Sequence, residues 1–131
     1  MVVERRTCAR LAPPPGYSHV VIARGTTNVW TAGAVPLDAA GNLVGADDHR
    51  AQADQVLRNL LAALQEAGAG PDQVVKTTVY VVGDQAALVA VWEVVRDSPI
   101  GAAQPASTLL GVERLGYSGQ LVEVEAVAVL P

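Results

Sequence analysis

Two glutamates near the C-terminus lie where a strand would place both carboxylates on one side. Residues 120–130 are rich in valine and predict a β-strand, in which successive side chains point to opposite faces. Glu123 and Glu125 then share a face and lie about 7 Å apart along the strand. The rest of that face is apolar: Leu121, Val127 and Val129. Such carboxylates indicate either a partly buried cleft with a general base or an outer strand that meets water, and both interpretations stay open.

Other chemistries find little support in the residue types and their spacing. His19 and His49 are far apart in the chain, and neither has the Asp, Glu or Cys neighbours of a metal site. Gly68 and Gly70 follow a predicted helix, whereas a phosphate-binding loop precedes one. The serines lack the flanking residues of an activated nucleophile. We therefore expect no metal and no cofactor.

Two helices are predicted from apolar residues that recur every three or four positions. The first covers residues 48–67, and Asp47 or Asp48 can cap its start. Its apolar face consists of Val56, Leu57, Leu60, Leu61 and Leu64. On its exposed side we expect the i,i+4 ion pairs Arg50/Asp54 and Asp54/Arg58. The second helix covers residues 85–96, with an inward face of Leu88, Val91, Trp92 and Val95.

Strands and turns account for most of the remaining chain. The predicted strands are residues 18–24, 29–35, 74–82, 107–112 and 120–130. Residues 98–105 are predicted as a loop, and residues 1–16, which contain three consecutive prolines, as an extended arm. The order β-β-α-β-α-β-β predicts a single α+β domain over residues 1–131, with two helices packed on one face of a mixed sheet.

Composition limits the function classes. Half of the 131 residues are hydrophobic, only 17% are charged and the net charge is −4, without a basic run, so nucleic acid is not an expected partner. The single cysteine, Cys8, forms no internal disulfide, and neither a signal-peptide segment nor a membrane-length apolar run is present. We expect a cytoplasmic protein without membrane contact. The few charges indicate apolar surface buried between subunits, although a GC-rich genome would give the same composition.

Four segments occur together in a distinctive order. A strand and turn at residues 30–38 (WTAGAVPLD) are followed by a helix segment at residues 52–59 (QADQVLRN). Two strands follow, at residues 74–80 (VVKTTVY) and 122–128 (VEVEAVA). This series, spread over residues 17–130, resembles the reactive-intermediate deaminase family, also called RidA or YjgF. The strand at residues 74–80 matches that family nearly residue for residue.

The resemblance implies a fold, an assembly and a site. The subunit has the chorismate-mutase-like fold, and its sheet packs into the barrel of a homotrimer that binds small molecules in clefts at the subunit interfaces. Active deaminases of this family hydrolyse imines and enamines without metal or cofactor. Carried over residue by residue, the catalytic group is Glu123, at the water-activating position. The substrate-binding positions are Tyr17, Ala32, Gly33, Ser107, Thr108 and Leu109.

The chain departs from the family where a substrate carboxylate is bound. The family has an arginine in a P-A-R segment, but residues 105–107 read PAS, so Ser107 stands at the arginine position. Each charge-assisted hydrogen bond of such an arginine contributes roughly 1.5–3 kcal/mol. Ala32, Ala34 and Val89 replace the family's serine, glutamine and asparagine. Arg114 matches a different family position, where we expect ion pairing rather than catalysis.

Three functions stay open at this point. The first is hydrolysis of an imine, enamine or related adduct by a water that Glu123 activates, on a substrate less anionic than an imino acid. The second is a binding module without catalysis. The third is an endoribonuclease or translation inhibitor, a label often attached to this family, against which the net charge of −4 argues.

Overall fold

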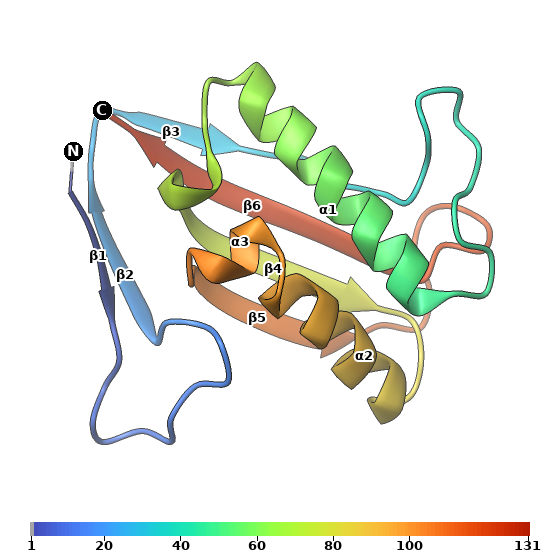
Figure 1. The fold of residues 1–131 in the computed structure, drawn as a ribbon, viewed down its shortest axis with the longest axis horizontal. Helices are drawn as coiled ribbons and strands as arrows, with labels where there is room; N and C mark the ends of the chain where they lie inside the picture. The colour runs from blue at the N-terminus through green and yellow to red at the C-terminus, as the bar shows by residue number, and fades with distance from the viewer. Residues whose placement is uncertain (1) are drawn as a thin grey trace.

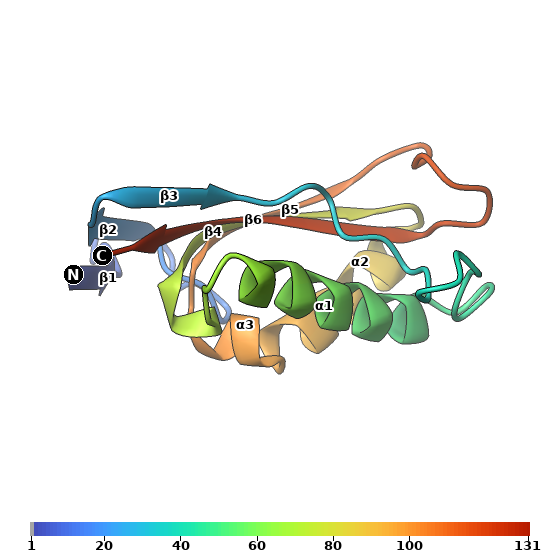
Figure 2. The same ribbon diagram turned by 90° about the horizontal axis from the view of Figure 1, so that it is seen from above.

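The computed structural model describes residues 2–131 and has two layers, a sheet and the helices on one of its faces (Figure 1). Four strands form the sheet in the order β3-β6-β4-β5. Their bounds are Thr27–Trp30 for β3, Val74–Val81 for β4, Ala106–Gly111 for β5 and Val122–Leu130 for β6. β4 and β5 run parallel and the other neighbours antiparallel, so the sheet is mixed. Figure 2 shows helices along one face only, which confirms the predicted α+β class.

Helices α1 (His49–Glu66) and α2 (Gln85–Arg96) begin where the sequence predicts. The Asp48 carboxylate accepts a hydrogen bond from the amide of Ala51, and Asp84 accepts one from the amide of Ala87. These bonds satisfy N–H groups that have no partner within the helix. The predicted apolar face of α1 is buried except for the partly exposed Leu61, whereas Val91 and Val95 are the buried residues of α2.

The register of the strands divides the sheet into a helix-covered face and an open face. On β6, Val122, Val124, Ala126 and Ala128 are buried against the helices. The alternate positions Glu123 and Glu125 pair with Tyr80 and Thr78 of β4 and lie on the open face. The predicted alternation is therefore confirmed over residues 122–128, and the two carboxylates do share one side, but β6 begins at Val122 rather than residue 120, and Val129, predicted on the glutamate face, is buried.

The N-terminal segment differs from the predicted extended arm. Strand β1 (Val2–Arg6) pairs antiparallel with β2 (Val20–Arg24) in a separate two-stranded ribbon beside the main sheet (Figure 1). The prolines that break regular structure lie between these two strands, and they do not prevent residues 2–6 from pairing. The predicted strand at residues 18–24 exists as β2, but it joins this ribbon and not the main sheet.

Three smaller predictions were also wrong. The strand expected over residues 29–35 ends at Trp30, and only a single bridge, between Ala34 and Val124, continues its pairing with β6. The expected loop at residues 98–105 contains a short helix, α3 (Pro99–Ala102), which Ser98 caps. Arg50 forms an ion pair with Glu93 of α2 instead of Asp54, because the two helices lie side by side. The Asp54–Arg58 pair is present.

A buried glutamine of α1 holds the segment that leads into β6. The side chain of Gln52 is fully buried and donates to the carbonyl oxygens of Gly45 and Gly119, at 3.1 and 3.0 Å. Its own carbonyl oxygen accepts from the amide of Leu121 at 2.7 Å. One side chain thus ties two loops to the helix, and one of these loops leads directly into the carboxylate-bearing strand.

Among residues 2–131, no helix is long and apolar enough to cross a membrane.

We predict that Gln52→Leu lowers the free energy of unfolding by at least about 2 kcal/mol, because it leaves buried backbone groups without partners. The matched control is Gln65→Leu, a substitution at an exposed position of the same helix that should change stability little. Urea unfolding measures both. Equal losses in the two variants would show that the buried hydrogen bonds of Gln52 are not what stabilises these loops.

Candidate functional site

Glu123 projects from the open face of β6 and is held at a fixed position. Its Oε1 accepts a hydrogen bond from the side-chain amide of Gln120 at 3.1 Å. Gln120 is only 3% exposed, and its carbonyl oxygen accepts in turn from the backbone amide of Tyr117 at 3.1 Å. The same amide nitrogen of Gln120 also donates to the carbonyl of Val122. A buried side chain with all of these bonds cannot rotate freely, so it fixes the orientation of the carboxylate.

Gly33 leaves the space that this carboxylate occupies. A Cβ atom at Gly33 would lie 2.5 Å from both Cδ and Oε2 of Glu123, well inside van der Waals contact. Gly33 and its exposed neighbour Ala32 belong to the segment that continues β3 along the edge of β6. Gly33 and Glu123, both predicted site residues, therefore touch within one chain. The Oε2 atom faces the Gly33 backbone.

The second carboxylate of the open face is engaged elsewhere. The Tyr80 hydroxyl donates to Oε1 of Glu125 at 2.5 Å. This hydrogen bond, followed by burial and by the negative charges of Glu125 and Glu123, raises the pKa of Tyr80 above its ordinary value. The phenol therefore stays protonated and keeps donating to Glu125 at neutral pH. Glu123, by contrast, accepts a side-chain hydrogen bond at only one oxygen among residues 2–131, from Gln120.

A separate hollow lies on the other side of the sheet, at the edge formed by β5. It has a volume of about 240 Å³ and is lined by Pro15, Tyr17, Trp92, Ser107 and Leu109. The rings of Tyr17 and Trp92 meet edge to face, with centroids 6.1 Å apart. The Trp92 indole N–H donates to the carbonyl of Pro15 at 2.8 Å, which fixes the ring against the N-terminal segment.

Ser107 and Leu109 enter this hollow because they alternate with Thr108 along β5. The Thr77 hydroxyl, 1% exposed, donates to Oγ of Ser107 at 2.8 Å, on the helix-covered side of the sheet. Thr108 pairs with Thr78 and lies on the open face, where Lys76 donates to its hydroxyl. The run of residues 107–109 that sequence comparison assigns to one site is thus divided between two faces.

Within one chain, five of the seven predicted site residues form two groups that do not meet. Tyr17, Ser107 and Leu109 line the hollow on one side of the sheet. Glu123 and Gly33 lie together on the opposite side. We call the first set the hollow. The second set, Glu123 together with Gly33, we call the carboxylate group. Neither group contains both a base and a binding pocket.

Two residues of these groups were missed by sequence reasoning. Trp92 was assigned only to the inward face of a helix, and its periodicity gave no indication that it would bond to residue 15. Gln120 was taken as the first residue of a strand, and nothing in its spacing showed that it would contact Glu123.

The histidines have structural roles: His49 bonds to the carbonyl of Val82, and His19 bonds to the loop at residues 8–12. Arg114 pairs with Glu113, as expected. Over residues 2–131, no cluster of three or more His, Cys, Asp or Glu side chains could hold a metal ion.

Comparison with known proteins now identifies the family. The family model described as endoribonuclease L-PSP matches residues 7–130. A RutC family protein of Synechocystis, slr0709, is 40% identical over 129 residues, covering 96% of this chain and 95% of that one. The solved structure of YyfB from Yersinia pestis, a protein of unknown function in the conserved Rid family, has 35% identity and a TM-score of 0.88, covering 99% of this chain and all of that one. Rv2704 of Mycobacterium tuberculosis, a YjgF/YER057c/UK114 family member, has 29% identity and a TM-score of 0.67, covering 98% of this chain and 100% of that one. The chain belongs to the RidA/YjgF family.

We predict that Gly33→Ala costs about 1–2 kcal/mol of stability through its clash with the Glu123 carboxylate. In a Glu123→Ala background the clash partner is absent, so the same substitution should cost little, and a double-mutant cycle measures the difference. Gly116→Ala, where a Cβ would meet nothing within 4 Å, is the neutral control. Gly101→Ala, whose Cβ would lie 2.1 Å from the Val95 carbonyl oxygen, should cost more than Gly33→Ala in either background. An additive cycle would contradict the contact.

Proposed function

We propose that this protein hydrolyses imines or enamines in a site that is completed between two subunits of a homotrimer, with Glu123 as the base that activates water. The observation that carries the proposal is the placement of Glu123: a carboxylate on an exposed sheet face, oriented by the buried Gln120 and seated against the Gly33 backbone. Family membership supports it, since the active deaminases of this family use a carboxylate at this position.

The chemistry requires one base and no metal. Glu123 takes a proton from water as the water oxygen forms a bond to the imine carbon and the C=N π electrons move to nitrogen, which takes up a proton. The product is a carbinolamine. Transfer of the hydroxyl proton, with loss of ammonia from carbon, then gives a carbonyl compound. An enamine enters the same sequence after protonation at carbon.

The position of the two groups supports a site shared between subunits. The hollow and the carboxylate group lie on opposite faces of one sheet, so one copy alone cannot present both to a small substrate. The open face also carries Trp30, 74% exposed, which pairs with the partly buried Val127 of β6. An uncovered sheet face with a large aromatic side chain favours association with a second copy. The trimer that the family resemblance implies would cover this face and bring the hollow of one copy to the carboxylate group of the next.

The word endoribonuclease, which describes the matching family model, is not extended to this chain. An RNA-binding surface needs cations that are available for phosphate. In residues 2–131, six of the eight arginines are in ion pairs with carboxylates: Arg6, Arg24, Arg50, Arg58, Arg96 and Arg114. Together with a net charge of −4, this pairing leaves little surface to follow a phosphate backbone.

We predict a trimer by light scattering coupled to size exclusion, and complementation between two inactive variants. Glu123→Gln removes the base, and Trp92→Ala opens the hollow. If each site takes one group from each of two neighbouring copies, trimers re-formed from a 1:1 mixture should recover about one quarter of the sites, although each parent is inactive. Mixed Glu123→Gln and Glu123→Ala proteins are the control and should recover nothing. A monomer at micromolar concentration would remove the shared site.

We also predict that 2-iminopropionate is hydrolysed weakly or not at all, because Ser107 stands where a carboxylate-binding arginine is needed. Semicarbazide competition, or coupled detection of pyruvate, measures the rate. Ser107→Arg should raise it in part, and the gain should vanish in Ser107→Arg/Glu123→Gln. Equal rates in those two variants would remove Glu123 from the mechanism. Ligand binding that survives Glu123→Gln, with no turnover in any variant, would favour the non-catalytic binding module.

A further inference from the structure

We propose that the hollow selects neutral imines with an apolar carbon chain, the kind formed when a simple amine is oxidised, over the imines of amino acids. Trp92 is the residue that determines this specificity. The inference rests on the proposed function and deepens it. The hollow would determine which molecule enters the site, whereas the carboxylate group would carry out the reaction on that molecule.

The lining of the hollow has no charge to offer a carboxylate. Three of its five side chains are apolar or aromatic without ionising at neutral pH: Pro15, Trp92 and Leu109. Tyr17 adds a phenol ring and Ser107 a hydroxyl. Because the Thr77 hydroxyl donates to Ser107, the proton of Ser107 is left to bond a neutral acceptor such as an imine nitrogen or carbonyl oxygen. A carboxylate moved into this space would lose its hydration without gaining an ion pair.

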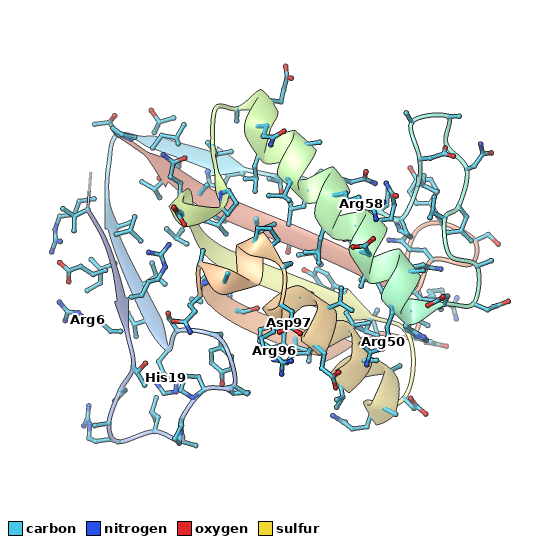
Figure 3. All side chains as sticks on the ribbon, in the orientation of Figure 1. Arg6, His19, Arg50, Arg58, Arg96 and Asp97 are labelled. Carbon is cyan, nitrogen blue, oxygen red and sulfur yellow. The ribbon has the colours of Figure 1, made fainter. Side chains whose placement is uncertain are left out.

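The cation nearest the hollow, Arg96, is already paired with a carboxylate. The methylene groups of Arg96 pack against Gly16, next to the lining residue Tyr17, since a Cβ at Gly16 would lie 2.6 Å from Cγ of Arg96. Its guanidinium, however, makes two hydrogen bonds to Asp97, at 2.8 and 3.2 Å, and the two charges cancel. Figure 3 shows Arg96 and Asp97 together near the end of α2, with His19 on the loop that follows β1.

His19 lies against Tyr17 and is held by the N-terminal segment. Its ring meets Tyr17 edge to face, with centroids 6.1 Å apart. Its Nδ1 accepts from the backbone N–H of Cys8 at 2.9 Å. Its Nε2 then donates to the carbonyl of Ala12 at 3.0 Å. Both ring nitrogens of His19 are therefore engaged by the loop at residues 8–12.

The size and rigidity of the hollow set the kind of group that fits. A volume of about 240 Å³ is smaller than the roughly 300–1,000 Å³ of sites for drug-sized ligands, so it suits a short chain of a few carbons. Trp92 is anchored through its N–H to Pro15 and through its edge to Tyr17, which leaves the indole as a fixed apolar wall. An apolar chain gains contact with this wall, and a charged one does not.

The test uses two imines that share a 3-methylbutyl skeleton and differ by a carboxylate. 3-Methylbutan-1-imine is generated from isoamylamine by an amine oxidase, and 2-imino-4-methylpentanoate from leucine by an amino-acid oxidase. Semicarbazide competition gives the acceleration of each hydrolysis. We expect the neutral imine to be favoured by at least about tenfold, Trp92→Phe to retain only part of that preference, and Ser107→Arg to reverse the order, since a guanidinium pairs strongly with a carboxylate. A native preference for the imino acid would overturn the proposal.

A binding measurement separates this inference from the proposed catalysis. Isovaleramide and isovalerate have the same shape and differ in charge, and calorimetric titration of the native protein gives the affinity for each. We expect the amide to bind at least about tenfold more tightly, with the order reversed in Ser107→Arg. This preference without turnover of either imine would retain the inference and reject the hydrolase. Tighter binding of isovalerate, or no binding of either compound, would reject the inference whatever the rates of imine hydrolysis.

Discussion

The two-residue alternation of β6 is the constraint on which the rest of the structure depends. β6 lies inside the sheet, between β3 and β4, and packs beneath α1. Four consecutive alternate positions, from Val122 to Ala128, have to be buried against the helices. A slip of one residue would place Glu123 and Glu125 in that core and the valines on the open face. The core therefore fixes the side on which the carboxylates project, and the position of the proposed base, Glu123, follows from packing before any catalytic requirement is considered.

The buried glutamines then turn that direction into a defined geometry. Gln52 lies on α1 and forms hydrogen bonds with the loop that precedes β6. Gln120, near the end of that loop, donates a hydrogen bond to Glu123. Both are almost fully buried, so each of their hydrogen bonds is expensive to break without a replacement. A carboxylate on an open sheet face would otherwise sample several rotamers. Here it is fixed by residues that the core itself immobilises, which is what a base needs in order to meet a water at one place.

Local rules recovered the helices and the central strands, because those elements are specified by nearby residues. Asp48 and Asp84 cap helices whose apolar periodicity is strong, and the alternation in β6 is visible in nine residues. Strand β1 was missed because it pairs with β2 on the far side of a proline-rich segment, and this pairing depends on tertiary contacts. The same reason applies to Trp92, whose partner is Pro15, far away in the chain. Family likeness named Ser107 and Thr108 together, but only the register of β5 shows that they face opposite sides.

The separation of the hollow from the carboxylate group has a consequence for how such a protein changes its substrate. In the proposed assembly, the residues that choose the substrate and the residue that activates water lie on different copies, and within one chain they are on opposite sides of the sheet. Under the proposed function, Ser107 at the position of the family's guanidinium alters what the hollow binds, while the hydrogen bond between Gln120 and Glu123 lies on the other side of the sheet. Stabilisation of the transition state at the reacting carbon and recognition of the rest of the substrate then contribute nearly independently to the activation free energy. Under the proposed function, loss of the family's arginine is therefore a change of specificity, and it does not by itself imply loss of the proposed reaction.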